Sequence, residues 1–227
     1  MHPLVRTART TGGFYLGLAF AGAAGFLILR PRLFASGDAE ATLANLVANG
    51  TLAHLGVALE LLVVLTQTLT AAWFYRLFRT VDSTAAAGIA AFGLVNAVAI
   101  LGSTALLATA AEIAAHPVGT TAPDVQVLYL ISGNLWTAGG LFFGLWLIPM
   151  GWCVLRSGWM PRALGWILIV GGTGYVLSAF LGFLLPQAGT VASFLTAPAS
   201  IGEFWMIGYL LIRGVRAEKE PSAGAAG

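Results

Sequence analysis

Charged residues are scarce in this chain of 227 residues: only 9% are Asp, Glu, Lys or Arg, whereas 58% are hydrophobic. About a quarter of the residues in soluble domains are charged, so this chain has too few charges to cover a globular surface. The mean hydropathy of +0.87 points the same way. A net charge of +2, without a basic run interleaved with aromatics, argues against a nucleic-acid partner. The composition therefore predicts an integral membrane protein.

Cysteine and the common catalytic motifs are also missing. Cys153 is the sole cysteine, which excludes an intramolecular disulfide and a cysteine-based metal cluster, and it is expected to be a packing residue. The chain has no Walker loop, nucleophile elbow, HExxH motif or deep histidine pair. No lysine or arginine falls inside an expected span, which argues against a retinal Schiff base and a voltage sensor. We therefore expect no cofactor and no metal.

What the chain has instead is long apolar runs. A bilayer core about 30 Å thick needs roughly 20 helical residues, and six stretches qualify: about 11–29, 51–75, 84–111, 127–155, 163–185 and 194–212. They predict an all-α bundle of six transmembrane helices in a single domain, 1–217, with a short polar tail, 218–227, expected to be disordered. Gly37-Asp38 predicts a turn before a short helix in the first long loop. A cleaved signal peptide over residues 1–23 is the rival interpretation, but the apolar run continues to Leu29.

The basic residues predict the orientation of the bundle. If the N-terminus is inside, the outer side receives only Arg30 and Arg32. The inner side receives the other nine cations, which are Arg6, Arg9, Arg76, Arg79, Arg156, Arg162, Arg213, Arg216 and Lys219. This asymmetry supports six spans and places both termini in the cytoplasm, as expected for a multi-pass protein of the plasma (inner) membrane.

Two glutamates interrupt the apolar runs. Glu60 and Glu203 each lie about nine residues into a span that runs inward, so we expect both carboxyls at similar depth, roughly 13–15 Å below the outer boundary. A carboxylate that faces lipid at that depth would cost several kcal/mol, so both should point into the bundle. Two adjacent carboxyls are the usual equipment for acid–base chemistry. We therefore predict Glu60 and Glu203 as catalytic residues. The simpler alternative is a structural hydrogen bond from each to a neighbouring hydroxyl or amide.

Other polar and aromatic side chains inside the spans are candidates for binding a substrate. An amide shares the helical face of Glu60, two more amides lie near mid-membrane, and deep aromatic rings can line an apolar pocket or stabilise a cation. The asparagines have a structural alternative, since amides often join membrane helices. The predicted substrate-binding residues are Gln67, Asn96, Asn134, Trp136, Phe142 and Trp205.

Three functions remain open on these residues. The first is an intramembrane, metal-independent enzyme that uses a glutamate to protonate a lipophilic isoprenoid and so catalyses its cyclisation or isomerisation. The second is a proton-coupled transporter of a small molecule, with the same carboxyls as a proton relay. The third is a non-catalytic module that binds a lipid or a partner helix. The expected partners are a lipophilic small molecule or lipid and the membrane itself.

Several motifs are similar to those of one bacterial membrane protein family. They are "GLWLIPMGWCVLRSGWMPRALGWILIVGGTGYVL" (144–177), a GxxYL-like span start from Gly13 to Leu16, Gly37-Asp38, Leu59-Glu60, and Glu203 followed by an apolar run to Arg213. With these motifs the chain resembles the family catalogued as domain of unknown function 4386 over nearly its whole length. The third span departs from the family, since many members have an acidic residue where this chain has Asn96. The resemblance implies six helices in a bacterial inner membrane and no established activity.

A weaker likeness concerns only the proposed site. Paired acidic residues in a helical bundle are similar to those of the small integral-membrane terpene cyclases of meroterpenoid pathways, which protonate an isoprenoid epoxide or alkene. Those proteins typically have seven helices, and no motif of this chain aligns with them, so the likeness is one of site chemistry.

Overall fold

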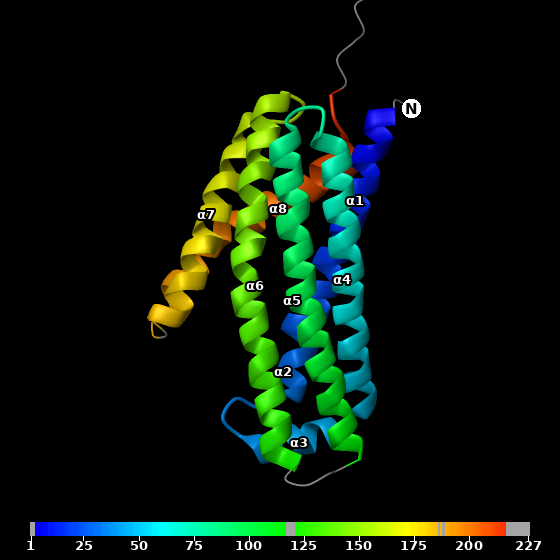
Figure 1. The fold of residues 1–227 in the computed structure, drawn as a ribbon, viewed down its shortest axis with the longest axis vertical. Helices are drawn as coiled ribbons and strands as arrows, with labels where there is room; N and C mark the ends of the chain where they lie inside the picture. Colours follow the sequence, from blue (N-terminus) through cyan, green and yellow to red (C-terminus); the bar gives the residue numbers. More distant parts are fainter. Residues whose placement is uncertain (1–2, 117–120, 186, 188, 217–227) are drawn as a thin grey trace, which may run out of the picture.

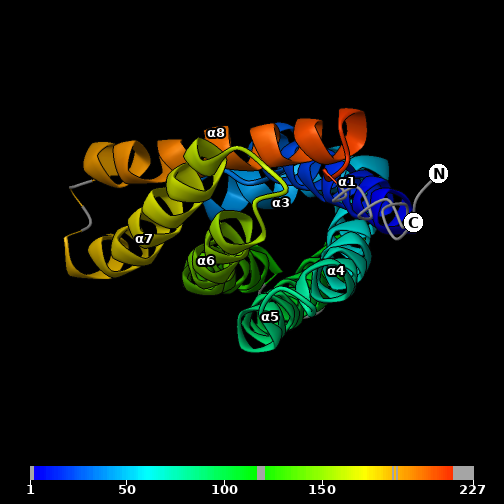
Figure 2. The same ribbon diagram turned by 90° about the horizontal axis from the view of Figure 1, so that it is seen from above.

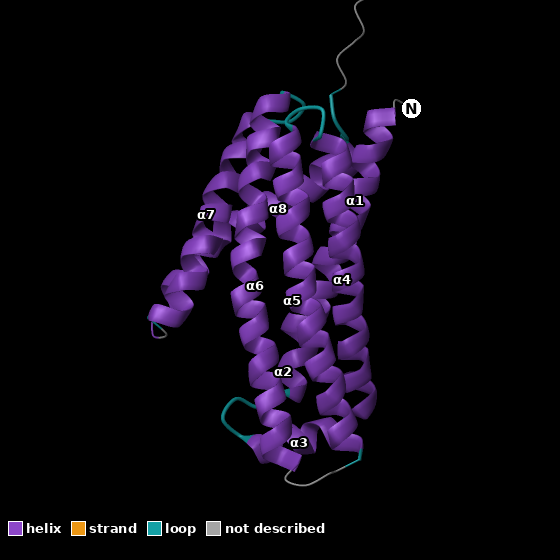
Figure 3. Cartoon of the chain, in the orientation of Figure 1, coloured by secondary structure: helices purple, strands orange, loops and turns teal. Residues whose placement is uncertain are grey.

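Every element in the described part of the chain is a helix (Figures 1 and 3). The computed structural model describes residues 3–116, 121–185, 187 and 189–216, so Lys219 and the predicted disordered tail lie outside the described residues. The elements are α1 (Pro3–Gly22), the π-helix η1 (Ala23–Leu29), α2 (Arg30–Leu33), α3 (Ala39–Ala48), α4 (Gly50–Phe78), α5 (Ser83–Ala115), α6 (Thr121–Ser157), α7 (Arg162–Leu184) and α8 (Gly189–Ile212).

The prediction of six transmembrane helices is confirmed. Within the described residues, six segments are long and apolar enough to cross a bilayer, and they coincide with the predicted spans: Pro3–Leu33, Gly50–Phe78, Ser83–Ala115, Thr121–Ser157, Arg162–Leu184 and Gly189–Ile212. Helices satisfy all their backbone hydrogen bonds internally, which is why this pattern can be read from hydropathy alone.

The short helix in the first loop is also where the sequence predicts it. Gly37 has a φ of +78°, which glycine adopts without strain. The Asp38 side chain then accepts a hydrogen bond from the Ala41 N–H at 2.9 Å and caps the start of α3. At the other side of this helix, Thr42 Oγ1 contacts Gln126 Oε1 of α6 at 2.8 Å, so α3 is fixed beneath the bundle.

The long helices form a ring in which sequence neighbours pack together. The pairs α4·α5, α5·α6, α6·α7 and α7·α8 are in contact, and α1 closes the ring by packing on α4 and α8 (Figure 2). Consequently α1 begins and α8 ends at the same end of the bundle (Figure 1), which we call the terminal end. The described cations that are predicted on the inner side lie within or next to the helix turns at this terminal end. Its cytoplasmic location remains a prediction from charge.

Two helix contacts depend on glycine. An added Cβ at Gly144 in α6 would lie 2.7 Å from the Gly172 carbonyl oxygen of α7, and one at Gly171 would lie 2.4 Å from backbone atoms of Ala199 in α8. Small residues let membrane helices approach closely enough to pack backbone on backbone. These contacts attach α7 and α8 to the rest of the bundle.

The α7–α8 pair reaches less far along the bundle than the helices beside it. α7 and α8 have 23 and 24 residues, whereas α4, α5 and α6 have 29, 33 and 37. The lower end of α7 therefore lies well above α3 in Figure 1. Figure 2, which views α4 to α6 nearly end on, shows α8 running across the bundle at a steep tilt. Both features shift the residues of α8 toward the terminal end.

Candidate functional site: two separated carboxyls and an aromatic cavity

Glu60 and Glu203 lie at different levels, so the expectation of matched depth is wrong. Measured along the helix axes, Glu60 is about 27 Å from Phe78 at the terminal end of α4, and Glu203 is at most about 14 Å from Ile212 at the end of α8. In a bilayer core about 30 Å thick, Glu203 is near the middle and Glu60 near the far side. Counting residues from the start of each apolar run does not give the relative depth of the two carboxyls, because α8 is shorter and more tilted than α4.

The Glu60 carboxylate is surrounded by hydrogen-bond donors. Ser103 Oγ of α5 donates to it at 2.9 Å, Trp136 Nε1 of α6 at 3.0 Å, and Thr104 Oγ1 lies 3.3 Å away. The side chain is only 6% exposed. An ionised carboxylate accepts hydrogen bonds and donates none, so this set of donors suits a fixed anion that joins three helices.

The Glu60 carboxyl is linked to a cation, Arg30, which lies just beyond the end of the predicted first span. The helical segment continues past Leu29 without a break, and the Arg30 guanidinium reaches Ser132 Oγ at 2.9 Å and the Tyr129 carbonyl at 2.7 Å. Ser132 Oγ contacts Ser103 Oγ at 2.8 Å, and Ser103 donates to Glu60. Guanidinium and carboxylate are thus connected through two serines. π-Helical turns are rare and often occur at functional sites, and here η1 directly precedes Arg30.

Aromatic rings surround the guanidinium on several sides. The Cζ atom of Arg30 lies 5.6 Å from the ring centroid of Phe26, 5.6 Å from that of Tyr129 and 5.9 Å from that of Phe34. Cation–π contacts of this length stabilise a partly desolvated cation. With its hydrogen bonds and its indirect link to Glu60, Arg30 therefore has the partners that a charge inside a membrane bundle requires.

Glu203 has a different environment, formed by α1 and α8. Tyr15 donates a hydrogen bond from its hydroxyl to Glu203 Oε1. The Tyr15 ring is buried and packs edge-on against Phe74 and Trp146, with both centroid distances 5.5 Å. This packing fixes the direction of the hydroxyl, so the Glu203 carboxyl is positioned by a rigid partner.

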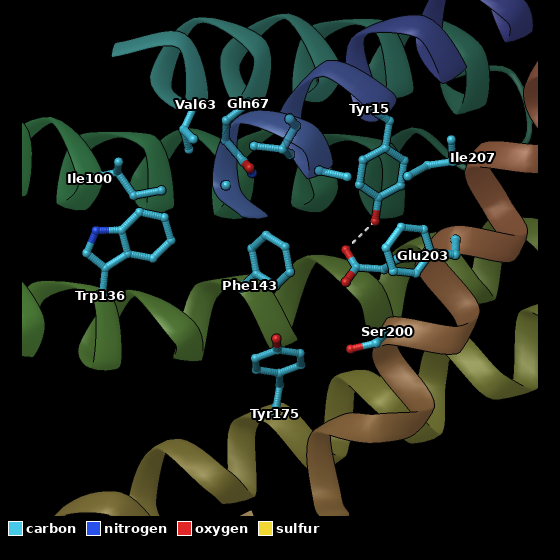
Figure 4. Close-up of a pocket in the computed structure, with 14 residues that line it drawn as sticks. Tyr15, Val63, Gln67, Ile100, Trp136, Phe143, Tyr175, Ser200, Glu203 and Ile207 are labelled. Atoms are coloured by element: carbon cyan, nitrogen blue, oxygen red, sulfur yellow. Dashed lines mark hydrogen bonds between the residues drawn. The ribbon is translucent and has the colours of Figure 1, made fainter. Parts of the chain in front are cut away.

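A cavity of about 190 Å³ extends from Glu203 toward Trp136 (Figure 4). Its wall is mostly apolar and aromatic, and the polar groups come from α1, α4, α6, α7 and α8. The lining residues are Tyr15, Leu18, Ala19, Gly22, Val63, Gln67, Ile100, Trp136, Phe143, Tyr175, Ser200, Glu203, Phe204 and Ile207. Glu60 does not line this cavity; it borders a much smaller space of about 20 Å³ beside Arg30. The two carboxyls therefore face different cavities.

Trp136 connects the two regions. Its indole Nε1 binds Glu60, while its ring forms the end of the aromatic cavity opposite Glu203, with the nitrogen on the side away from Glu203 (Figure 4). The Arg30–Ser132–Ser103–Glu60 network therefore fixes the position of one wall of the cavity.

A second cavity of about 420 Å³ adjoins the first. The two share the wall formed by Gly22, Trp136, Phe143 and Tyr175. Leu27 and Thr137, which also line the second cavity, are exposed on the outside of the bundle. The second cavity therefore connects the wall of the first one with the surface between η1 and α6.

The structure brings three of the predicted substrate-binding residues to these cavities. Gln67 and Trp136 line the first, and Asn96 and Trp136 line the second. It does not bring the other three there. Asn134 is exposed, because a step of two residues from Trp136 turns a helix by about 200°. Phe142 packs on Phe92, centroid to centroid 6.5 Å, while its neighbour Phe143 lines both cavities.

The third misplaced residue is Trp205, which is 39% exposed and lines neither of the two cavities. Its neighbours Phe204 and Glu203 line the cavity instead. In each case a cavity-lining side chain lies on the predicted helix, one or two residues away from the predicted residue.

The structure adds four functional candidates to those predicted from the sequence: Tyr15, Tyr175, Ser200 and Arg30. Tyr15 had one available signal, since it lies in the GxxYL-like start of the first span. Tyr175 lies within the long motif of residues 144–177 and carried no signal that distinguished it from other aromatic residues there. Arg30 follows the last residue of the apolar run, so hydropathy predicts a loop at its position.

The fold and the site define an all-α, multi-pass membrane protein with an aromatic cavity that has a carboxyl at one end. A family model described as "Domain of unknown function (DUF4386)" matches residues 10–214, and the chain belongs to this family. The resemblance seen in the sequence motifs is thereby confirmed.

A second comparison covers much less of the chain. An uncharacterized protein of Archaeoglobus fulgidus is 40% identical over 45 residues, which are 20% of this chain and 28% of the archaeal protein. The chain thus spans little more than a quarter of the length of this relative. No solved structure matches the chain significantly.

Proposed function

We propose that this protein binds a lipophilic small molecule in the aromatic cavity, within the plasma (inner) membrane. The observation that carries the proposal is the composition of the cavity wall, in which an apolar and aromatic surface converges with a few polar groups: Tyr15, Gln67, Tyr175, Ser200 and Glu203. Small-molecule sites have this character, with apolar walls for affinity and a few polar groups for orientation. Taken together, the two adjoining cavities of about 190 and 420 Å³ also have the size of such sites, about 300–1,000 Å³.

A lipophilic molecule would reach the cavity from the bilayer. The second cavity opens beside Leu27 on the outside of the bundle, in the half that is distant from the terminal end. The shared wall contains Gly22, which has no side chain to obstruct passage, and the rings of Trp136, Phe143 and Tyr175. Lateral entry requires no aqueous channel and suits a substrate that is dissolved in lipid.

Substitution of one glycine tests the binding proposal. A Cβ added at Gly22 meets nothing within 4 Å, so Gly22→Leu should fill the junction of the two cavities without displacing the backbone. Gly13→Leu, in the same helix and equally unobstructed, is the matched control on the exposed face. Binding of farnesol and geranylgeraniol to the purified, delipidated protein would be measured by tryptophan fluorescence and by the shift in Tm.

The proposal expects binding to the wild type and to Gly13→Leu, and a loss of at least about tenfold in Gly22→Leu, since about 1.4 kcal/mol of lost contact is tenfold. Equal binding to all three proteins would place the ligand elsewhere. Absence of binding across a panel of isoprenoid alcohols, quinones and fatty acids would overturn the proposal.

Acid catalysis is a second candidate function, favoured by the position of Glu203 among aromatic rings. Glu203 lines the same cavity as Tyr15, Trp136, Phe143, Tyr175 and Phe204. The Glu203 carboxyl would donate its proton to an alkene or epoxide of a bound isoprenoid, and the faces of these rings would stabilise the resulting carbocation. Loss of a proton from a neighbouring C–H to the Glu203 carboxylate would restore the acid. The net reaction is an isomerisation or cyclisation without a change in oxidation state.

This reaction uses one carboxyl rather than a pair. Glu60 faces another cavity and accepts hydrogen bonds from three side chains, so its place in this proposal is to position Trp136. Membranes would be incubated with polyprenyl alkenes and epoxides and the products analysed by mass spectrometry. Glu203→Gln should abolish the product, and Glu112→Gln, an exposed glutamate of α5, should retain it. Unchanged product formation in Glu203→Gln would exclude this mechanism.

A further inference from the structure

Gln67 is a fully buried polar side chain that has no hydrogen-bond partner in the described part of the chain. Its exposed fraction is 0%, and neither its Nε2 nor its Oε1 atom finds a partner among the described residues. Nearly all buried amides in proteins are hydrogen-bonded, because an unpaired buried polar group is destabilising. The presence of a glutamine rather than an apolar residue at this position therefore needs an explanation.

The position of the Gln67 amide supplies an explanation. Gln67 lines the aromatic cavity, and Figure 4 shows it reaching from α4 toward Phe143, between Trp136 at one end and Tyr15 with Glu203 at the other. The side chain is held on its other side by the close packing of α4 and α5, where its Nε2 would lie 3.4 Å from a Cβ added at Gly93. The amide therefore lies in the wall of the cavity, packed against α5.

A second unpaired donor lies in the same neighbourhood. Trp146 is fully buried, and its Nε1 has no partner among the described residues. A Cβ at Gly93 would lie 3.1 Å from Cε3 of Trp146, so Trp146 and Gln67 both pack around Gly93. The interior of the bundle thus offers more hydrogen-bonding capacity at this level than the protein itself satisfies.

We infer that Gln67 binds the polar head of the ligand and selects a lipophilic alcohol, with the Gln67 Nε2 donating to the ligand oxygen and Oε1 accepting from its hydroxyl. An amide offers one donor and one acceptor side by side, and a hydroxyl group both accepts and donates, so the two are complementary. A hydrocarbon or an ether cannot satisfy both atoms. The inference rests on the proposed function, because it assigns a role to Gln67 within the same cavity.

The arrangement also fixes the direction of the ligand. With the hydroxyl at Gln67, the apolar tail extends past Trp136, Phe143 and Gly22 into the second cavity and toward the bilayer. This direction keeps the polar head away from lipid and leaves the apolar part in an apolar environment. Discrimination by a site with buried hydrogen-bonding groups is stronger than discrimination by shape alone, because the wrong ligand leaves those groups unpaired.

The test compares geranylgeraniol with its methyl ether, which has the same chain and cannot donate a hydrogen bond. Affinities for both would be measured on the full-length protein in nanodiscs, for the wild type, Gln67→Leu and the control Thr68→Val. The control is adjacent in α4, where its hydroxyl bonds to the Val64 carbonyl at 2.8 Å and is not part of the cavity wall.

The wild type and Thr68→Val should prefer the alcohol by about tenfold or more, and Gln67→Leu should bind both ligands within about twofold of each other. Gln67→Leu should also raise the Tm of the ligand-free protein, because it removes an unpaired buried amide. Retention of the alcohol preference in Gln67→Leu, together with normal binding, would overturn the inference and leave the proposed function intact. Absence of binding to the wild type would overturn both.

Discussion

Tyr15 and Glu203, separated by 188 residues in sequence, are joined by a hydrogen bond from the tyrosine hydroxyl to the glutamate carboxyl. This bond links the first and last long helices, α1 and α8, and closes the ring of helices around the cavity. The same contact therefore contributes both to the stability of the bundle and to the orientation of the one carboxyl that lines the aromatic cavity.

Removal of the Tyr15 hydroxyl should loosen this closure. Tyr15→Phe keeps the ring packed on Phe74 and Trp146 but leaves Glu203 without its donor, which should lower the free energy of unfolding by about 1–3 kcal/mol. Reversible unfolding in mixed micelles would measure the change. Tyr75→Phe, at an exposed position of α4, should have little effect. Equal stability of Tyr15→Phe and the wild type would show that the bond is not formed.

Arg30 and Glu60 should be energetically coupled through the two serines between them. Removal of one partner from a directly paired, buried ion pair lowers the free energy of unfolding by about 3–5 kcal/mol. We expect each single substitution here to lower it by less, about 1–3 kcal/mol, because the two side chains are linked only through the serines and Arg30 is half-buried. In a double-mutant cycle with Arg30→Met and Glu60→Gln, the coupling energy should exceed about 0.5 kcal/mol. Additive effects of the two substitutions would show that the serine network does not connect them.

The glycine contact between α7 and α8 should tolerate no side chain. Gly171→Ala would place a Cβ 2.4 Å from the Ala199 backbone and should destabilise the protein by about 1–3 kcal/mol or more. Gly208→Ala in α8, where an added Cβ meets nothing within 4 Å, should be neutral or stabilise by up to about 1 kcal/mol through helix propensity. Thermal unfolding of both variants checks the contrast, and similar losses in the two would contradict it.

The loop between α4 and α5 should make stability depend on pH. The pKa of Asp82 lies below its usual range because the Ala85 N–H donates to the carboxylate at 3.0 Å and Trp152 and Arg156 also donate to it. A carboxyl with a lower pKa in the folded state contributes stability above its unfolded pKa of about 4 and loses that contribution as the pH falls through the folded pKa. The difference in Tm between wild type and Asp82→Asn should therefore be largest near pH 7 and decrease toward pH 3. A difference that is constant over this range would contradict the assignment.

The transmembrane topology could be predicted from sequence because each span is an autonomous physical unit. A lipid-embedded helix must be long, apolar and internally hydrogen-bonded, and all three requirements are visible in the local sequence. Gly37 and Asp38 likewise predict a turn and a helix cap from local sequence, because the cap joins Asp38 to Ala41, only three residues further on. None of these features depends on where another helix lies.

The relationships between helices could not be predicted in the same way. The depth of Glu203 depends on the tilt of α8 and on the length of the α7–α8 pair relative to α4 to α6 (Figures 1 and 2). The choice of Phe143 over Phe142 depends on a rotation of about 100° about the axis of α6. Arg30 was missed because the helix continues beyond the apolar run, where aromatic rings and Ser132 can accept a cation. Each of these is a property of packing rather than of local sequence.

The most direct test of the central claim, that the aromatic cavity holds a lipophilic molecule, is photo-cross-linking with a diazirine analogue of geranylgeraniol, followed by mapping of the labelled residues. We expect labelling of cavity residues such as Val63, Phe143 and Ile207, suppression of this labelling by unlabelled geranylgeraniol, and its loss in Gly22→Leu. Labelling confined to outward-facing residues such as Phe20 and Ile212, with no competition by the unlabelled alcohol, would contradict it.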